Sequence, residues 1–160
     1  MKRRFINFYN NLKEPIHKPD LKRFLLEGFL GAIVFGSMMG AISFILRNSV
    51  FGFVSLFTFL IYYVFMFNRL YRSFSFYHII YSILGVFFIL LGDYFMGVSY
   101  NVLYWFIVSE GQIIWQLFNP IIHFQFLFIW TLNPLDIFLN LLNILIYAYI
   151  IVMTYRRMKR

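Results

Sequence analysis

The sequence predicts an all-α integral membrane protein. We expect a four-transmembrane-helix bundle with an N-terminal amphipathic interfacial helix and an outer amphipathic or re-entrant segment between helices 3 and 4. The first observation is composition: the 160 residues are 62% hydrophobic and 12% charged, whereas soluble domains carry about 25% charged residues. The second is that the apolar residues gather in segments of about 20 residues, enough to cross a bilayer. The third is that the cations lie between these segments.

Four apolar segments are the expected spans: 24–46, 50–67, 76–98 and 135–154. At about 1.5 Å per residue, the second barely crosses a hydrocarbon core of about 30 Å. Asp20 is the expected N-cap of the first helix. Asn133 and Pro134 are the expected cap and first residue of the last.

The spans form one transmembrane domain, residues 24–154, because the helices must pack on one another. Residues 1–23 form a basic N-terminal segment, and residues 155–160 form a basic tail. Within the first, Phe5, Phe8, Tyr9 and Leu12 recur at helical spacing. Residues 1–14 are therefore either an amphipathic helix on an anionic leaflet or a disordered basic tail that only sets orientation.

The positions of the cations predict the orientation. Thirteen of the fourteen Lys and Arg residues precede the first span, lie between the second and third, or follow the fourth. Four spans with both termini in the cytoplasm place all thirteen inside and only Arg47 outside, as the positive-inside rule requires. We expect a multi-pass protein of a bacterial cell membrane. The same distribution does not match a nucleic-acid groove, so no nucleic-acid partner is expected.

This orientation exports residues 99–133, the outer cap, which contains no Lys or Arg. Two further full spans do not fit in it, so the cap is interfacial or re-entrant. Its uncharged polar residues are separated by 3, 4, 3 and 4 positions, which predicts one polar stripe along a helix bent at Pro120. We expect this stripe to bind a partner; it comprises Ser109, Gln112, Gln116, Asn119 and His123.

The first span carries small residues every four positions: Gly28, Ala32, Gly36 and Gly40. Small residues at this spacing let two helices approach closely. The stripe predicts packing within the bundle, which we prefer; the alternatives are a dimer interface or a gliding surface in a transporter.

Asp93 is a carboxylate inside the third span, and an ionisable residue there is a functional candidate. Its expected partner is Arg47, the single outer cation, in a buried ion pair; the alternative is that Asp93 is solvated among the outer headgroups. Glu27 follows Arg23 by four residues, the spacing of a helical ion pair.

Chemistry-bearing motifs are missing from the sequence. There is no Cys and no nucleophile or phosphate-binding motif. Glu110, Asp136, Asp93 and His123 include metal-ligand types but lack ligand spacing. We therefore expect no metal, no cofactor and no enzymatic activity.

The expected function is that of an accessory or interaction subunit whose outer cap contacts a partner protein, lipid or peptide. Its partners would be the lipid bilayer and either another membrane protein or further copies of the chain. The first alternative is a small oligomeric permease or channel with Asp93 in the route. A third class is an outer-face metal enzyme that uses His123, Glu110 and Asp93.

Overall fold

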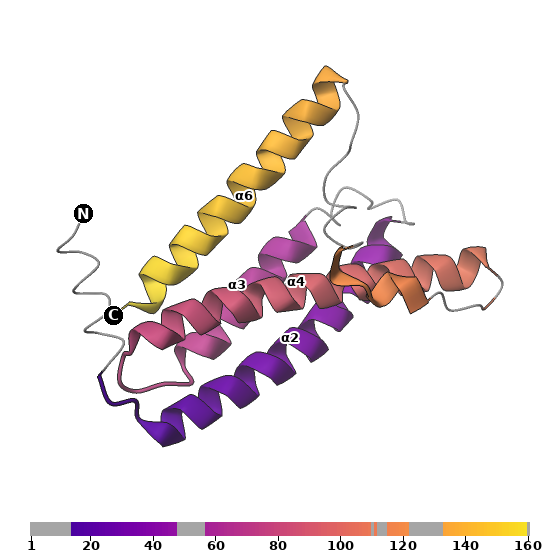
Figure 1. The fold of residues 1–160 in the computed structure, drawn as a ribbon. Coiled ribbons are helices and arrows are strands. Elements are labelled where there is room, and N and C mark those ends of the chain that lie inside the picture. The colour runs from indigo at the N-terminus through magenta and orange to yellow at the C-terminus, as the bar shows by residue number, and fades with distance from the viewer. Residues whose placement is uncertain (1–13, 48–56, 110, 112–114, 122–132, 160) are drawn as a thin grey trace.

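A computed structural model describes residues 14–47, 57–109, 111, 115–121 and 133–159. Every regular element in this part of the chain is helical. Three helices are long and apolar enough to cross a membrane, which confirms the all-α class and agrees with a membrane location. The elements, shown in Figure 1, are α2 (Lys18–Arg47), α3 (Thr58–Tyr71), α4 (Ile79–Val108), the 3-10 turn η2 (Trp115–Phe118) and α6 (Pro134–Met158).

The helix α2 begins at Lys18, six residues before the expected span. Its first backbone hydrogen bond runs from the N–H of Leu21 to the carbonyl of His17 (3.1 Å). Pro19 is tolerated in this first turn because the first N–H groups of a helix have no partner within it. Asp20 is therefore not the N-cap: its carboxylate accepts a hydrogen bond from the backbone N–H of Ser75 (2.9 Å), in the loop between α3 and α4.

The helix α3 has 14 described residues, and it ends four residues later than the expected span 50–67. Part of that span, and the residues 1–14 considered for an interfacial helix, lie largely outside the described residues. The loop after α3 is short, and α4 starts at Ile79 with the His78 side chain as its N-cap, accepting from the N–H of Ile80 (3.2 Å).

The helix α4 runs ten residues past the expected end of the third span, so residues 99–108 belong to α4 and not to the cap. It ends where Gly111 adopts a positive φ of 97°, and the Gly111 N–H bonds the carbonyl of Phe106 (2.9 Å). A glycine in the left-handed region is a common helix terminator. The prediction that one continuous helix carries the polar stripe through this position is therefore wrong.

The helix α6 begins at Pro134, as expected, and continues to Met158, four residues into the expected basic tail. Arg156 and Arg157 lie in its last turn. Cations are favourable there because the C-terminal end of a helix carries partial negative charge, which accounts for the added turn.

The helices α2 and α4 run side by side in the same direction. A Cβ on Gly36 would overlap the backbone of Gly92, and one on Gly40 would overlap the backbone of Met96. Residues further along α2 therefore contact residues further along α4, so the two helices are parallel. Their backbones meet at these positions without intervening side chains.

The helices α3 and α6 run the opposite way. Arg69, near the end of α3, bonds Glu27, near the start of α2. Met158, at the end of α6, lies against Gly85, near the start of α4. The described helices thus alternate in direction, and the basic residues Lys22, Arg23, Arg69, Arg72 and Arg156 lie at one end of the molecule, which we call the basic end. Figure 1 shows α6 diverging from α4 towards the other, far end.

The best-packed part of the interior lies nearer the basic end and is aromatic. Phe24, Phe74, Tyr81 and Phe88 are buried together, with the Phe74 and Tyr81 rings stacked at 4.8 Å. Outward positions are apolar instead of polar; they include Leu26, Leu30 and Val34 of α2 and Leu141, Ile144 and Leu145 of α6. Such a surface suits lipid tails, which are as apolar as these side chains.

Candidate functional site

Asp93 lies at a junction of helices in the interior. Its side chain is 4% exposed and accepts a hydrogen bond from the hydroxyl of Tyr147 of α6 (2.5 Å). This short O–H···O bond has the length expected of a carboxylate acceptor. It ties α4 to α6 between residues 54 positions apart in the sequence.

The neighbouring Gly92 makes room for this arrangement. On one side the Gly36 backbone of α2 contacts it, and on the other the Tyr62 hydroxyl of α3 fills the space above it. Tyr62 is fully buried and donates to the carbonyl of Phe88 (3.2 Å). Groups from α2, α3 and α6 therefore meet at two adjacent residues of α4, Gly92 and Asp93.

The structure does not form the suggested Arg47–Asp93 pair. Gly36 packs beside Gly92, so Asp93 is level with the middle of α2, whereas Arg47 lies eleven residues further on, about 16 Å along the helix. Its guanidinium lies over the ring of Tyr100 at 5.6 Å. An alternative polar partner for Asp93 had a sequence signal: Tyr147, Ile150, Thr154 and Met158 are spaced 3, 4 and 4 apart, which marks one face of α6.

The suggested helical pair of Arg23 and Glu27 is also replaced by a contact between helices. The Glu27 carboxylate instead accepts from Nε of Arg69, and the Arg69 guanidinium lies over the ring of Phe35 at 5.3 Å. Sequence spacing points only to partners on the same helix, which is why Arg69 was missed.

The suggested partner-binding stripe is divided among several local structures. The Ser109 hydroxyl bonds the carbonyl of Trp105 (2.6 Å) at the end of α4. The Asn119 side chain accepts from the N–H of Ile121 (3.0 Å) and starts a new helical turn. Gln116 is exposed on η2. Gln112 and His123 lie outside the described residues.

The described part of the cap folds back along α4. Leu117 of η2 is buried, and the Tyr94 hydroxyl bonds the carbonyl of Phe118. Tyr94 lies well before the end of α4, so the chain returns towards the middle of the molecule after Gly111. The opposite side of η2 stays open, with Trp115 81% exposed.

Gly28, Ala32, Gly36 and Gly40 are all buried in α2. Gly28 lies against the Phe88 ring of α4, and the last two lie against the α4 backbone, as described above. In this chain the small-residue stripe therefore faces another of its own helices.

The suggested metal ligands are not brought together in the part of the chain that the structure describes. Within it, no three His, Asp or Glu side chains form a group able to hold a metal ion. Glu110 and His123 lie outside the described residues, so the metal prediction itself stays untested.

Fold and site together define an all-helical protein with apolar outer faces and an enclosed carboxylate–tyrosine contact. Comparison of the chain with family models, with curated proteins and with solved structures finds no match in any of the three.

Proposed function

We propose that the chain is a non-enzymatic accessory subunit of a bacterial cytoplasmic membrane, with four spans and both termini in the cytoplasm. Its outer end binds another membrane protein. One observation carries this proposal: α4 continues past the end of α2 and exposes apolar side chains there. In the proposed topology, this region lies beyond the hydrocarbon core.

The alternating helix directions support the topology. Four alternating passes return the chain to its starting side, and the ends that gather there carry the Lys and Arg residues that the positive-inside rule assigns to the cytoplasm. The described part of α3 spans about 21 Å at 1.5 Å per residue. A complete second span therefore also needs residues from 48–56, which the structure does not describe.

The length of α4 supports the exposed outer end. Its 30 residues extend about 45 Å, against a hydrocarbon core of about 30 Å. A tilt of about 20°, typical of membrane helices, shortens its vertical reach by only a few ångströms. Arg47, a cation at the end of a span, belongs at the headgroup level, and its contact with Tyr100 puts Tyr100 at the same level.

Eight residues of α4, 101–108, continue beyond this level, about 12 Å further. Ile107 is 64% exposed there, and Phe106 and Val108 are also exposed. Contiguous apolar surface in water marks an interaction site. A partner protein that covers this end of α4 would remove its apolar side chains from water.

The composition of the neighbouring surface fits a protein partner. Trp115 projects from η2, and Gln116 and Asn119 are exposed beside it. Aromatic residues with uncharged polar neighbours are typical of the centre of protein interfaces, where charged residues are depleted. We call residues 101–108 and 115–119 the outer surface.

Site-specific photo-crosslinking in intact cells tests this proposal. A photoreactive side chain at Ile107 or Trp115 should give the same discrete protein adduct, whereas one at the exposed Val34 of α2, which faces lipid, should give none. Replacing Ile107 by Asp should abolish the adduct formed from Trp115. An adduct of twice the chain mass would identify the partner as a second copy; adducts at Val34 alone, or none, would overturn the proposal.

The polar residues of the cap provide a second test. Replacing Gln112, Gln116 and Asn119 together by Leu should abolish the crosslink from Ile107, while the amount of chain inserted in the membrane stays unchanged. If the crosslink survives, these polar residues have only a structural role.

A second candidate function is a small oligomeric permease or channel, favoured by the buried carboxylate of Asp93. Flux of protons or cations into proteoliposomes, lost on Asp93→Asn, would support it. If proteoliposomes with the wild-type chain and with Asp93→Asn both show only background leakage, this second function is rejected. Neither the 510 Å³ cavity at the basic end nor the 390 Å³ groove between α3 and α6 is lined by Asp93, so we place this candidate second.

A further inference from the structure

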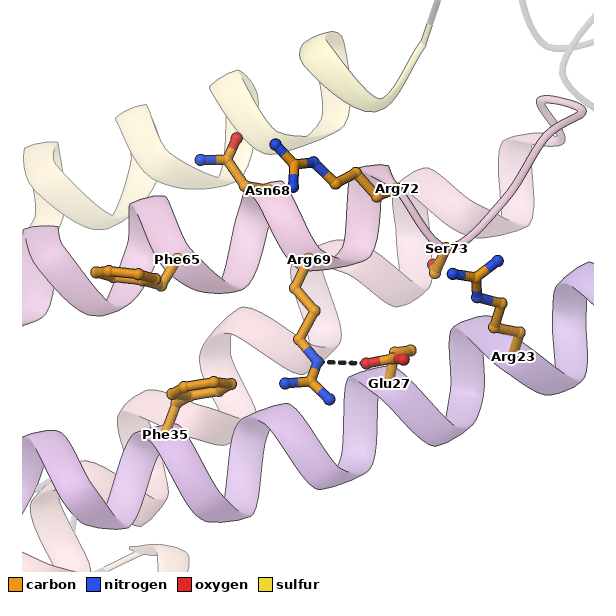
Figure 2. Close-up of a pocket in the computed structure, with 8 residues that line it drawn as sticks. All are labelled: Arg23, Glu27, Phe35, Phe65, Asn68, Arg69, Arg72 and Ser73. Carbon is orange, nitrogen blue, oxygen red and sulfur yellow. Dashed lines mark hydrogen bonds and ion pairs between the residues drawn. The ribbon is translucent and has the colours of Figure 1, made fainter.

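A cavity of about 510 Å³ opens between α2 and α3 at the basic end. Its lining includes Arg23, Glu27, Arg69 and Arg72 at one end and the aromatic residues Phe35 and Phe65 at the other. Figure 2 shows Arg23 extending from α2 towards α3, Arg69 reaching from α3 to Glu27, and the two rings further along the helices. The cavity is thus cationic at one end and apolar at the other.

The charges in this cavity do not cancel. Glu27 pairs with Arg69, which compensates one of the three cations. Within the part of the chain that the structure describes, neither Arg23 nor Arg72 forms an ion pair. Two positive charges are therefore available to an anion.

Arg69 is held in position for a ligand. Its Nε is bonded to Glu27 and its guanidinium lies over the ring of Phe35 at 5.3 Å. The terminal amino groups have no other partner among the described side chains. Guanidinium groups bind phosphate oxygens through paired N–H donors, and a guanidinium fixed in place loses less side-chain freedom on binding.

The polarity of the cavity follows the polarity of a membrane leaflet. From Arg23 to Phe35, α2 rises about 18 Å. The headgroup layer of one leaflet is about 5–8 Å thick, by difference between the whole bilayer and its hydrocarbon core. A site of this length that starts among headgroups therefore reaches well into the acyl region.

We propose that this cavity binds an anionic phospholipid of the cytoplasmic leaflet. Arg23 and the terminal amino groups of Arg69 hold the phosphate, Arg72 adds charge at the rim, and Phe35 and Phe65 contact the upper acyl chains. Glu27 is a positioning residue that orients Arg69. This inference rests on the membrane location proposed above but not on the partner at the outer surface.

The test uses the full chain, purified in detergent and offered equal amounts of phosphatidylglycerol and phosphatidylcholine, with bound lipid counted by native mass spectrometry. Wild type should retain phosphatidylglycerol preferentially. Arg23→Gln with Arg72→Gln should reduce that retention about tenfold, the loss expected for charge-assisted hydrogen bonds. Neither residue forms an ion pair with another described residue, so these changes leave the Glu27–Arg69 contact intact.

A matched control removes the same charge from the same end. Lys22 and Arg157 are exposed and do not line the cavity, so Lys22→Gln with Arg157→Gln should change retention less than twofold. Equal loss in the two double variants would reduce the effect to general surface charge and overturn the proposal. Equal retention of the two lipids by wild type would also overturn it.

A competition experiment separates a lipid from a soluble anion. Inorganic phosphate and glycerol phosphate should fail to displace bound phosphatidylglycerol, because neither reaches Phe35 and Phe65. Displacement at millimolar concentration would show that the phosphate group alone suffices and would overturn the assignment to a lipid. A wild-type chain that binds phosphatidylglycerol selectively but gives no crosslink at Ile107 would retain this inference and reject the proposed partner.

Discussion

The hydroxyl of Tyr62 occupies the space in which a side chain at position 92 would lie. A Cβ built on Gly92 overlaps the hydroxyl and the ring carbon that bears it. Tyr62 cannot withdraw freely, because it is fully buried and its hydroxyl donates to the Phe88 carbonyl. The absence of a side chain at Gly92 therefore sets the distance between α3 and α4.

Gly92→Ala should destabilise the protein by about 1–3 kcal/mol, the usual cost of adding a methyl group to a filled interior. The measurement is thermal unfolding of the purified chain in detergent. Gly85→Ala is the control, because the three atoms nearest to a Cβ there all belong to the flexible Met158 side chain, the first at 3.0 Å. Equal losses of stability in both variants would contradict a specific role for the Tyr62 contact.

Tyr147→Phe should destabilise the attachment of α6 by about 0.6–2 kcal/mol, the range for hydrogen bonds between membrane helices. The change leaves the ring in place and removes the donor to Asp93. Tyr149→Phe is the matched control, since Tyr149 is 61% exposed. Unfolding in detergent would show no difference between the two variants if the Asp93 contact contributed nothing.

Asp20→Ala should speed hydrogen exchange at the backbone amides of Ser75 and Phe76, because both donate to the Asp20 carboxylate. Exchange measured by mass spectrometry on the loop peptide reports this effect. Glu14→Ala, at an exposed position, should leave exchange there unchanged. Slow exchange in the Asp20 variant would mean that other contacts hold the loop.

The same contact predicts a pH dependence. Asp20 precedes the apolar stretch of α2, and the hydrogen bond from Ser75, with those from Phe76 and His17, lowers the pKa of its carboxyl below the ordinary 3.8, against the opposing effect of desolvation. A lowered folded-state pKa stabilises the contact above the ordinary value, and that contribution is lost as the pH falls through the folded pKa. Loop exchange in wild type, corrected for intrinsic rates, should therefore accelerate only below about pH 3.8.

The topology predicts a labelling pattern in intact cells, for which the chain without native cysteine is convenient. Single cysteines at Ile107 and Gln116 should react with an impermeant thiol reagent, and one at Ser75 should react only after the cells are opened. A reporter fused after Arg160 should be active only in the cytoplasm. An active reporter outside the cell membrane would reverse the orientation and the roles of both ends.

The sequence alone predicted the helical class and three of the apolar helices within a few residues at most ends. These features depend on how much apolar surface each segment carries and on local chain geometry, both of which are written in consecutive residues. The start of α6 at Pro134 is such a local property, because proline is suited to the first position of a helix.

The start of α2 and the end of α4 were predicted less well. Asp20 has the sequence character of an N-cap, yet its carboxylate bonds a loop 55 residues away. The end of α4 depends on Gly111, whose positive φ breaks the helical stripe that the spacing of Ser109, Gln116 and Asn119 suggested. Residue spacing alone does not reveal where a chain reverses.

Only the tertiary structure decided which polar groups meet. Sequence reasoning paired Asp93 with Arg47 and Glu27 with Arg23 by charge and by proximity along the chain. The structure instead pairs Asp93 with Tyr147 and Glu27 with Arg69, in each case on another helix. The backbone contact between Gly36 and Gly92 sets the axial alignment of α2 with α4, and that alignment determines which side chains are within hydrogen-bonding distance.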